Sequence, residues 1–217
     1  MTTVKRYPNF LTQSQCTKIL EWLEPQPYAK TRYKTDSEGN EIVQYGIKHL
    51  DLHLGTGVVC ELINPLIMNT FGRLPTNSSF TESHEPFALH VDTPATFEQK
   101  GYESLHKEDM NLSFIIPLKH GPGHQTVFFD YYRHTIDNEI ESAGLKTEKL
   151  AVPQFDGVED LSHLTNTERH ILAENNIRVD DYENWKIGDA FSWLRTQLHC
   201  AGNINTRGAK EAIVLFF

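Results

Sequence analysis

Two polar side chains, His90 and Asp92, stand two residues apart in the mostly apolar stretch PFALHVDTPATF at residues 86 to 97. Alternate side chains of a strand point to the same side, so an imidazole and a carboxylate would share one strand face here. If that face is covered, burying both groups is costly unless something pairs with them. The partner is either a hydrogen-bonding group on a neighbouring strand or a metal ion.

A second histidine and a basic residue lie near the C-terminus, within GDAFSWLRTQLHCAGNINTRGAKEAIVLFF. His199 follows a predicted strand, and Lys210 begins the next strand eleven residues later. Two histidines and one carboxylate on one face of an iron leave three positions open, which is the ligand arrangement of non-haem Fe(II) oxygenases. His90, Asp92 and His199 are therefore candidate metal ligands, and Lys210 is a candidate partner for an anion.

The stretch KHLDLHL offers a competing set of ligands, His49, Asp51 and His53. On a regular strand that rises about 3.3 Å per residue, the two histidines would lie about 13 Å apart. One metal ion cannot bind both. We predict that these residues lie on the surface or at most line the mouth of a pocket.

The elements that would position these residues are mostly strands. Alternation and β-branched or aromatic content predict strands at about 86–92, 111–118, 124–130, 189–194 and 209–217. The turn SEGN predicts a hairpin within 28–45, and HGPGHQ is expected to join 111–118 and 124–130 as another hairpin. Apart from the charged Lys210 and Glu211 near its start, the last strand is apolar on both faces, so it should lie inside a covered sheet.

Helices are expected to flank these strands. NFLTQSQCTKILEWLEPQP has an apolar stripe that begins after a capping box of Thr12 and Gln15. A second helical region lies within GVVCELINPLIMNTFG, where Asn64 and Pro65 either start a new helix or kink one. The sequence thus predicts a mainly β protein with flanking helices.

Residues 131–185 differ from the rest of the chain in composition. They carry 12 acidic and 5 basic residues, a net charge of −7 out of −9 for the whole chain. They contain LTNTERHILAEN, a predicted short helix with Thr165 and Glu168 as a capping box. This acidic insertion is either a solvated surface excursion or a lid over a site, since long insertions between strands often carry function.

Composition restricts the class of protein. A length of 217 residues suits one domain over residues 1–217, and the acidic balance argues against binding nucleic acid or an anionic membrane surface. No apolar run approaches the length of a membrane span, and MTTVKRYPNFL has no signal-peptide core. The chain has three cysteines, which are far apart in sequence. An odd number of such cysteines indicates reduced thiols and not a disulfide framework. We therefore expect a cytoplasmic protein.

The chain resembles the Fe(II)/2-oxoglutarate-dependent oxygenases. Its C-terminal segment is similar to the phytanoyl-CoA-hydroxylase-like branch, in which Gly-Asp-Ala is followed by His-x-x-Gly-x-Asn-x-Thr-x-Gly-x-Arg. The match runs through Gly188, Asp189, Ala190, His199, Gly202, Asn203 or Asn205, Thr206, Gly208 and Lys210. Lysine replaces the arginine of that branch, as in the collagen prolyl hydroxylases. NFLTQSQCTKIL is also similar to the capped helix with which prolyl-hydroxylase-like chains often begin.

The resemblance, which covers roughly 86–130 and 187–217, implies a double-stranded β-helix, a jelly-roll or cupin-like barrel. It implies that His90, Asp92 and His199 bind Fe(II) inside this barrel. The co-substrate 2-oxoglutarate would chelate the iron, and its distal carboxylate would pair with Lys210.

Other residues are candidates for binding the co-substrate. Arg207, eight residues after His199, is the rival of Lys210. A hydroxyl group, from Thr206 or Ser113, would add a hydrogen bond to the co-substrate.

The resemblance implies hydroxylation of an amino acid, a peptide or another small organic substrate, with release of succinate and CO2. The net charge of 131–185 favours a cationic or zwitterionic substrate, and so an amino acid or a peptide, over a polyanion. Two alternatives stay open: a barrel that binds metal without turnover, as a sensor or structural part, and a metal-assisted hydrolase or cupin-type isomerase. The intact ligand set together with Lys210 speaks against the first alternative, and the second would not need Lys210.

Overall fold

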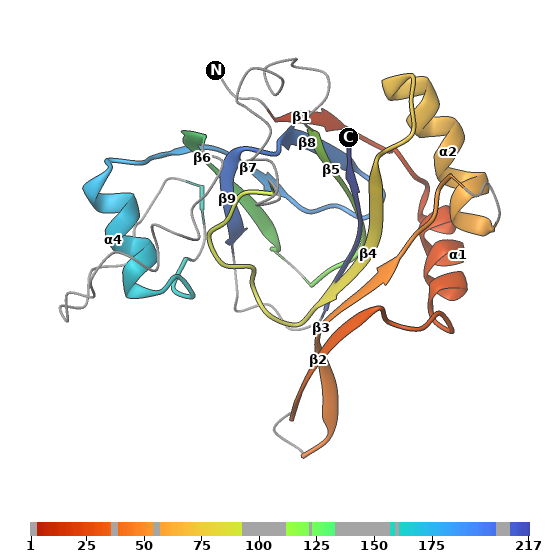
Figure 1. The fold of residues 1–217 in the computed structure, drawn as a ribbon, viewed down its shortest axis with the longest axis horizontal. Coiled ribbons are helices and arrows are strands. Elements are labelled where there is room, and N and C mark those ends of the chain that lie inside the picture. The colour runs from red at the N-terminus through yellow and green to blue at the C-terminus, as the bar shows by residue number, and fades with distance from the viewer. Residues whose placement is uncertain are drawn as a thin grey trace.

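The structure is a computed structural model that describes residues 4–35, 39–53, 57–92, 112–121, 123–132, 157–158, 161–202 and 209–217. Two antiparallel sheets face each other in it (Figure 1). The seven-stranded sheet consists, in spatial order, of β1 (Lys5–Tyr7), β8 (Ala190–Leu194), β5 (Leu112–Lys119), β10 (Lys210–Phe216), β4 (Asn77–Ser83), β3 (Glu41–His49) and β2 (Lys30–Thr35). The three-stranded sheet consists of β7 (Val179–Asn184), β6 (Gln125–Tyr132) and β9 (Gln197–Gly202).

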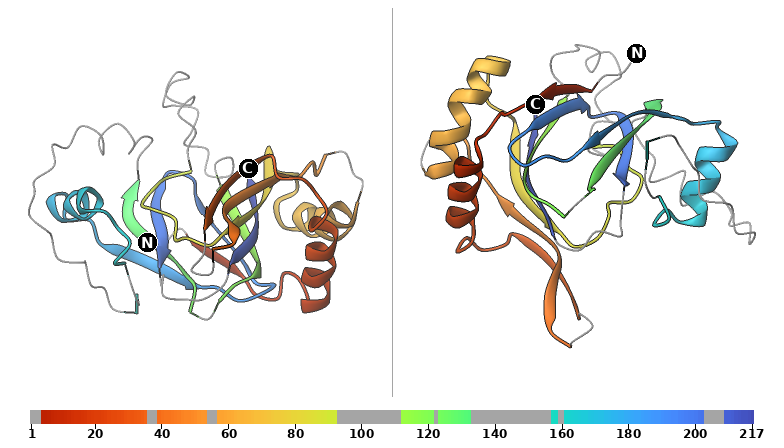
Figure 2. Two further views of the ribbon diagram at one scale, coloured as in Figure 1. Left: turned by 90° about the horizontal axis from the view of Figure 1, so that it is seen from below. Right: turned by 180° about the vertical axis from the view of Figure 1, so that it is seen from behind.

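Helices α1 (Gln13–Leu23) and α2 (Val58–Phe71) cover the outer face of the large sheet, as the views from the front and from behind agree (Figures 1 and 2). The predicted capping box of Thr12 and Gln15 is present at the start of α1. Pro65 lies inside α2 and starts no new helix, which resolves the alternative that the sequence left open. The largest apolar cluster lies between these helices and the inner strands β4, β5 and β10.

Helix α4 (Asn166–Glu174) lies on the opposite side of the molecule, beyond the small sheet (Figure 1). Its predicted capping box of Thr165 and Glu168 is present. A second apolar cluster joins Leu172 of this helix to Val127 and Phe129 of β6 and to Leu198 of β9. None of the helices in the described residues is long and apolar enough to cross a lipid bilayer.

Strand β10 lies at the centre of the large sheet, between β4 and β5. Ile213 and Leu215 pack into the cluster under the helices, whereas Lys210, Val214 and Phe216 line a pocket on the inner face. The prediction of a strand covered on both faces is confirmed. Cys16, Cys60 and Cys200 are buried and free, as expected.

The turn before β8 explains the glycine of the Gly-Asp-Ala motif. Gly188 has φ +82°, and a Cβ atom there would lie 2.2 Å from the carbonyl oxygen of Leu11. Its own backbone accepts a hydrogen bond from Leu11 N (2.8 Å) and donates one to Pro117 O (3.0 Å). This motif glycine therefore joins the segment before α1 to the large sheet.

Two predictions about strand pairing are wrong. HGPGHQ does not close a hairpin, because β5 belongs to the large sheet and β6 to the small one; the turn carries the chain from one sheet to the other. Residues 86–92 form no regular strand and make a single bridge, between His90 and His199. Phe87 lines the pocket together with His90 and Asp92, so strict alternation does not hold there.

Four strands, β1, β4, β7 and β9, were not predicted from the sequence. His199 lies within β9 and does not follow β8 as a loop residue. Strand β7 comes from the end of the acidic insertion 131–185 and pairs with β6. Much of that insertion lies outside the described residues, as do Thr206 and Arg207.

Candidate metal centre

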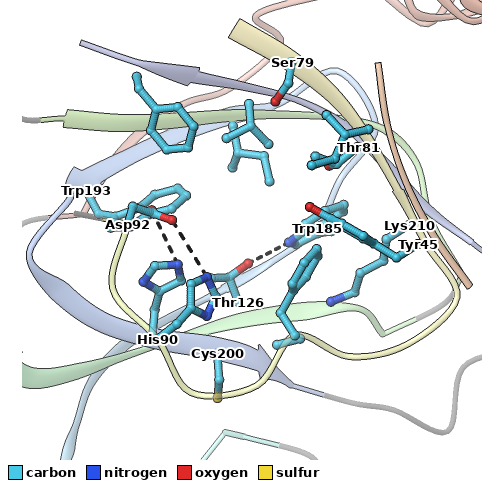
Figure 3. A pocket seen from close by; sticks show the side chains of 17 residues that line it. Tyr45, Ser79, Thr81, His90, Asp92, Thr126, Trp185, Trp193, Cys200 and Lys210 are labelled. Atoms are coloured by element: carbon cyan, nitrogen blue, oxygen red, sulfur yellow. Dashed lines mark hydrogen bonds and ion pairs between the residues drawn. The ribbon is translucent and has the colours of Figure 1, made fainter. Parts of the chain in front are cut away.

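A pocket of about 380 Å³ lies between the two sheets (Figure 3). The large sheet contributes residues of β3, β4, β5, β8 and β10, and the small sheet contributes residues of β6 and β9. The segment 87–92, which bridges to β9, contributes Phe87, His90 and Asp92. The predicted metal ligands and Lys210 therefore meet in one pocket.

His90 and Asp92 lie together at one end of this pocket (Figure 3), and His199 pairs with His90 through a backbone bridge. One ligand atom from each of His90, Asp92 and His199 lies within 4.8 Å of the other two. Asp92 Oδ1 is 3.8 Å from His90 Nε2, and Asp92 Oδ2 is 3.6 Å from His199 Nε2. This is the one such cluster of His, Cys, Asp or Glu side chains in the part of the chain that the structure describes.

Both imidazoles are held with Nε2 free to bind a metal. His90 Nδ1 lies 2.7 Å from Ala88 O, and His199 Nδ1 lies 2.9 Å from Gln197 O. A carbonyl oxygen only accepts hydrogen bonds, so each Nδ1 carries the proton and each Nε2 keeps its lone pair. Hydrogen bonds from the second ring nitrogen to a carbonyl are the usual support of metal-binding histidines. The donor set fits a divalent transition metal such as Fe(II).

Burial keeps His199 in the neutral form that a metal requires. Desolvation, together with the nearby His90, lowers the pKa of His199 to about 4, against the opposing effect of Asp92. At neutral pH the proton therefore does not compete with a metal for its Nε2.

Asp92 is held by two groups whose role the sequence did not show. Ser113, predicted to bind co-substrate, donates its hydroxyl hydrogen to Asp92 Oδ2 over 2.6 Å. Arg195 lies in the turn between β8 and β9. Its guanidinium donates to the backbone oxygen of Asp92 over 3.0 Å, and its backbone oxygen accepts from Asp92 N over 2.8 Å. No sequence signal pointed to Arg195, because a turn arginine carries no pattern of its own.

Lys210 lines the same pocket and lies across it from His90 (Figure 3). Lys210 is 6% exposed. Its Nζ atom lies 3.5 Å from Gln125 O and 5.1 Å from the centre of the Trp185 ring. No carboxylate of the described residues forms an ion pair with it. Burial lowers the pKa of Lys210 to about 8, as expected for a buried cation without an anion beside it.

Four residues with hydroxyl groups line the same pocket as Lys210, namely Tyr45, Ser79, Thr81 and Thr126. Trp185 Nε1 donates to Thr126 Oγ1 over 2.9 Å, so the hydroxyl hydrogen of Thr126 is left to donate elsewhere. Burial raises the pKa of Tyr45, which keeps its phenol protonated and able to donate. Sequence reasoning missed both residues, because Tyr45 lies in a hairpin strand and Thr126 in a strand with no motif.

The competing set His49, Asp51 and His53 is exposed and lies outside the pocket. His53 Nε2 instead contacts Pro75 O at 2.7 Å. The prediction that these residues lie on the surface is confirmed.

No protein-family model matches the sequence, and no curated protein is significantly similar to it. Solved structures do resemble the fold. The non-heme alpha ketoglutarate dependent epimerase SnoN from nogalamycin biosynthesis superposes with a TM-score of 0.54 at 13% identity, over 99% of this chain and 78% of that one. The non-heme alpha ketoglutarate dependent carbocyclase SnoK gives 0.52 at 13% identity, over 99% and 79%.

A second structure of SnoN, in complex with Fe3+, alpha ketoglutarate and nogalamycin RO, gives a TM-score of 0.51 at 12% identity, over 99% of this chain and 78% of that one. At such identities the likeness concerns the fold. The chain has the double-stranded β-helix fold of these enzymes. The fold that the sequence resemblance implied is confirmed.

Proposed function

We propose that this protein is an Fe(II)- and 2-oxoglutarate-dependent dioxygenase that hydroxylates an amino acid, a peptide or another small organic substrate. One observation carries the proposal. Two imidazole Nε2 atoms and a carboxylate converge within 4.8 Å in a pocket that also holds a buried lysine with no carboxylate partner among the described residues.

His90, Asp92 and His199 would hold the iron through two ring nitrogens and a carboxylate oxygen. Bound Fe(II) would supply the chemistry of O2 reduction coupled to oxidation of 2-oxoglutarate to succinate and CO2, with one oxygen atom of O2 going to succinate and the other to the substrate. Three protein ligands leave room at the metal for the 2-oxo acid and O2. Ser113 and Arg195 keep the carboxylate of Asp92 and its backbone in place.

Lys210 would bind the distal carboxylate of 2-oxoglutarate. The pairing is strong because a buried cation gains a charge-assisted hydrogen bond in a site of low dielectric constant. Thr126 and Tyr45 line the same pocket and have hydroxyl hydrogens to donate to that carboxylate. The reaction of a hydrolase or an isomerase with the same metal ligands would not require this lysine.

Aromatic side chains close the pocket around the histidines. The Trp193 ring lies 5.1 Å from the His199 ring, and Phe87 and Phe216 line the same pocket. An apolar wall of this kind excludes water from the reacting groups. The acidic composition of 131–185 supports a cationic or zwitterionic substrate.

The test is succinate formation by the purified protein with Fe(II), 2-oxoglutarate and O2, measured across a panel of amino acids and peptides. Succinate that depends on all three reagents and is stimulated by one panel member supports the proposal. Analysis of that substrate's product separates hydroxylation from the epimerase and carbocyclase outcomes named for SnoN and SnoK. Metal binding without any succinate would overturn the proposal in favour of a non-catalytic barrel.

A further inference from the structure

The segment 87–92 carries two of the three ligands, yet it is paired along one side only. Toward β9, His90 N donates to His199 O and His199 N donates to His90 O, both over 2.9 Å, and Ala201 N donates to Phe87 O over 3.1 Å. Successive N–H groups of an extended chain point to opposite sides, so the N–H of Leu89 points away from β9. Leu89 is 3% exposed, and a buried N–H without a partner is costly.

A glutamate of α4 accepts this N–H. Leu89 N donates to Glu168 Oε1 over 2.8 Å, across 79 residues of sequence. Glu168 Oε2 accepts from both the backbone N and the hydroxyl of Thr165, each over 2.6 Å. Glu168 is 4% exposed, and every one of these contacts uses it as an acceptor, as an ionised carboxylate requires.

The same peptide group also orients a ligand. The carbonyl of Ala88 and the N–H of Leu89 belong to one peptide unit. That carbonyl accepts from His90 Nδ1 over 2.7 Å, while the N–H donates to Glu168. A continuous chain therefore runs from the Glu168 carboxylate through one peptide to the ring whose Nε2 faces Asp92 and His199.

Such a chain has two physical effects. It fixes the tilt of the peptide, and with it the direction of the His90 ring. It also polarises the peptide, because a charged acceptor on the N–H makes the carbonyl oxygen a stronger acceptor for Nδ1–H. In metal sites a carboxylate that bonds directly to the second nitrogen of a histidine raises the affinity of that ligand. Here a peptide stands between the carboxylate and the histidine.

Packing makes the connection stiff. Leu89 belongs to the same apolar cluster as Leu164 and Leu172, on either side of Glu168 in sequence. His163 Nε2 lies 3.2 Å from Phe87 O, so the segment before α4 makes a second contact with the ligand segment.

We propose that Glu168 is a positioning residue of the metal centre, acting on His90 through the Ala88–Leu89 peptide. The inference rests on the proposed function only in requiring that His90, Asp92 and His199 bind a divalent metal. It gives the start of α4 a role in the site, although this helix contributes no side chain to the pocket lining.

The test uses Co(II), whose visible absorption reports its coordination, titrated into the full-length apo protein. Glu168→Ala should weaken Co(II) binding about 10- to 100-fold, the range for outer partners of metal ligands. Glu168→Gln keeps one acceptor oxygen but no charge, so its loss should be smaller than that of the alanine variant. The altered direction of His90 should also change the Co(II) spectrum of Glu168→Ala.

Two matched controls separate positioning from stability. Thr165→Ala removes the hydroxyl half of the same capping box, which donates to Glu168 Oε2, and keeps the Oε1 atom that accepts from Leu89 N. Glu174→Gln removes a carboxylate at the far end of α4, where it pairs with His170. Both should bind Co(II) within about twofold of wild type, although Thr165→Ala should lower the melting temperature of the apo protein.

Wild-type Co(II) affinity in Glu168→Ala would overturn the inference. An equal loss of affinity in Thr165→Ala at an equal loss of melting temperature would also overturn it, since Glu168 would then act only by stabilising α4. If Glu168→Ala does not fold, the Gln variant decides in the same way. A wild-type protein that binds neither Co(II) nor Fe(II) would overturn the proposed function itself, which is a distinguishable outcome.

Discussion

Replacing Lys210 with methionine should stabilise the empty protein and at the same time remove tight binding of 2-oxoglutarate. Methionine is unbranched and of similar length, but it carries no charge. Burial lowers the pKa of Lys210 from 10.5 to about 8. At about 1.4 kcal/mol for each pKa unit, holding this lysine charged in the empty pocket costs about 3 kcal/mol of folding free energy below pH 8.

The effect of pH on this difference has a definite sign. The unfolded chain keeps the lysine proton up to about pH 10.5, whereas the folded chain loses it near pH 8. Between these values the unfolded state binds more protons, so the free energy of unfolding rises with pH. The advantage of Lys210→Met should be complete below pH 8 and should shrink toward zero as the pH approaches 10.5.

Binding of 2-oxoglutarate should change in the opposite direction. A hydrogen bond to a charged group contributes about 1.5–3 kcal/mol, so the dissociation constant for 2-oxoglutarate should rise about 10- to 150-fold in Lys210→Met. Only the charged lysine pairs with the carboxylate. The affinity of the wild-type protein should therefore fall by up to about tenfold for each pH unit above 8, a dependence that the Met variant should lack.

Thermal unfolding of the apo proteins and calorimetric titration of 2-oxoglutarate into the Co(II)-loaded proteins, both from pH 7 to 10, check these expectations. Arg207→Ala serves as the control and should shift the dissociation constant far less. A Met variant that binds 2-oxoglutarate as wild type does, or that is less stable than wild type at pH 7, would refute the reasoning. If only Arg207→Ala loses affinity, the carboxylate belongs to Arg207.

The remaining predictions concern the metal ligands and their surroundings. Asp92→Ala should abolish succinate formation with an unchanged circular dichroism spectrum, and wild-type turnover at saturating iron would disprove its role as a ligand. Ser113→Ala removes the donor to Asp92 Oδ2, so it should weaken Co(II) binding about tenfold and leave 2-oxoglutarate binding to the metal-saturated protein nearly unchanged; a selective loss of 2-oxoglutarate affinity would return Ser113 to the co-substrate. Burial lowers the pKa of His199 to about 4 and the pKa of His124 to about 3. Between about pH 6.5 and 4 the unfolded chain therefore binds protons at these histidines that the folded chain does not bind. The free energy of unfolding of the apo protein should fall as the pH falls through this range. His124→Gln should flatten that slope in thermal unfolding, and an unchanged slope would count against this origin.

The candidate ligands and the lysine were recognisable from residue type and spacing. His90 and Asp92 stand out because two polar groups interrupt an apolar stretch, and Lys210 because it opens an otherwise apolar strand. The helices were recognisable for a similar reason, since the capping boxes of Thr12 and Thr165 are local interactions within four residues. Features of this kind depend on residues that are close together in the chain, so they can be recognised from the sequence alone.

Pairing between distant strands could not be predicted in the same way. Alternation describes which faces of a strand are apolar, but it does not name the strand that receives its hydrogen bonds. The segments β5 and β6 looked like a hairpin because a turn with two glycines separates them, yet they pair with β8 and β9 in opposite sheets. The polar strand β4 was missed because its own residues show no strand pattern. Its hydrogen bonds to neighbouring strands such as β10 hold it in the extended conformation.

The sequence by itself thus determined which groups can bind a metal and an anion, since those properties belong to single side chains. The tertiary structure decided what surrounds them. Ser113 bonds to Asp92 across 21 residues, Arg195 bonds to Asp92 across 103, and Glu168 bonds to the Ala88–Leu89 peptide across 79. The physical reason is that a buried polar group accepts whichever partner the fold brings within about 3 Å, and that partner carries no mark in the sequence.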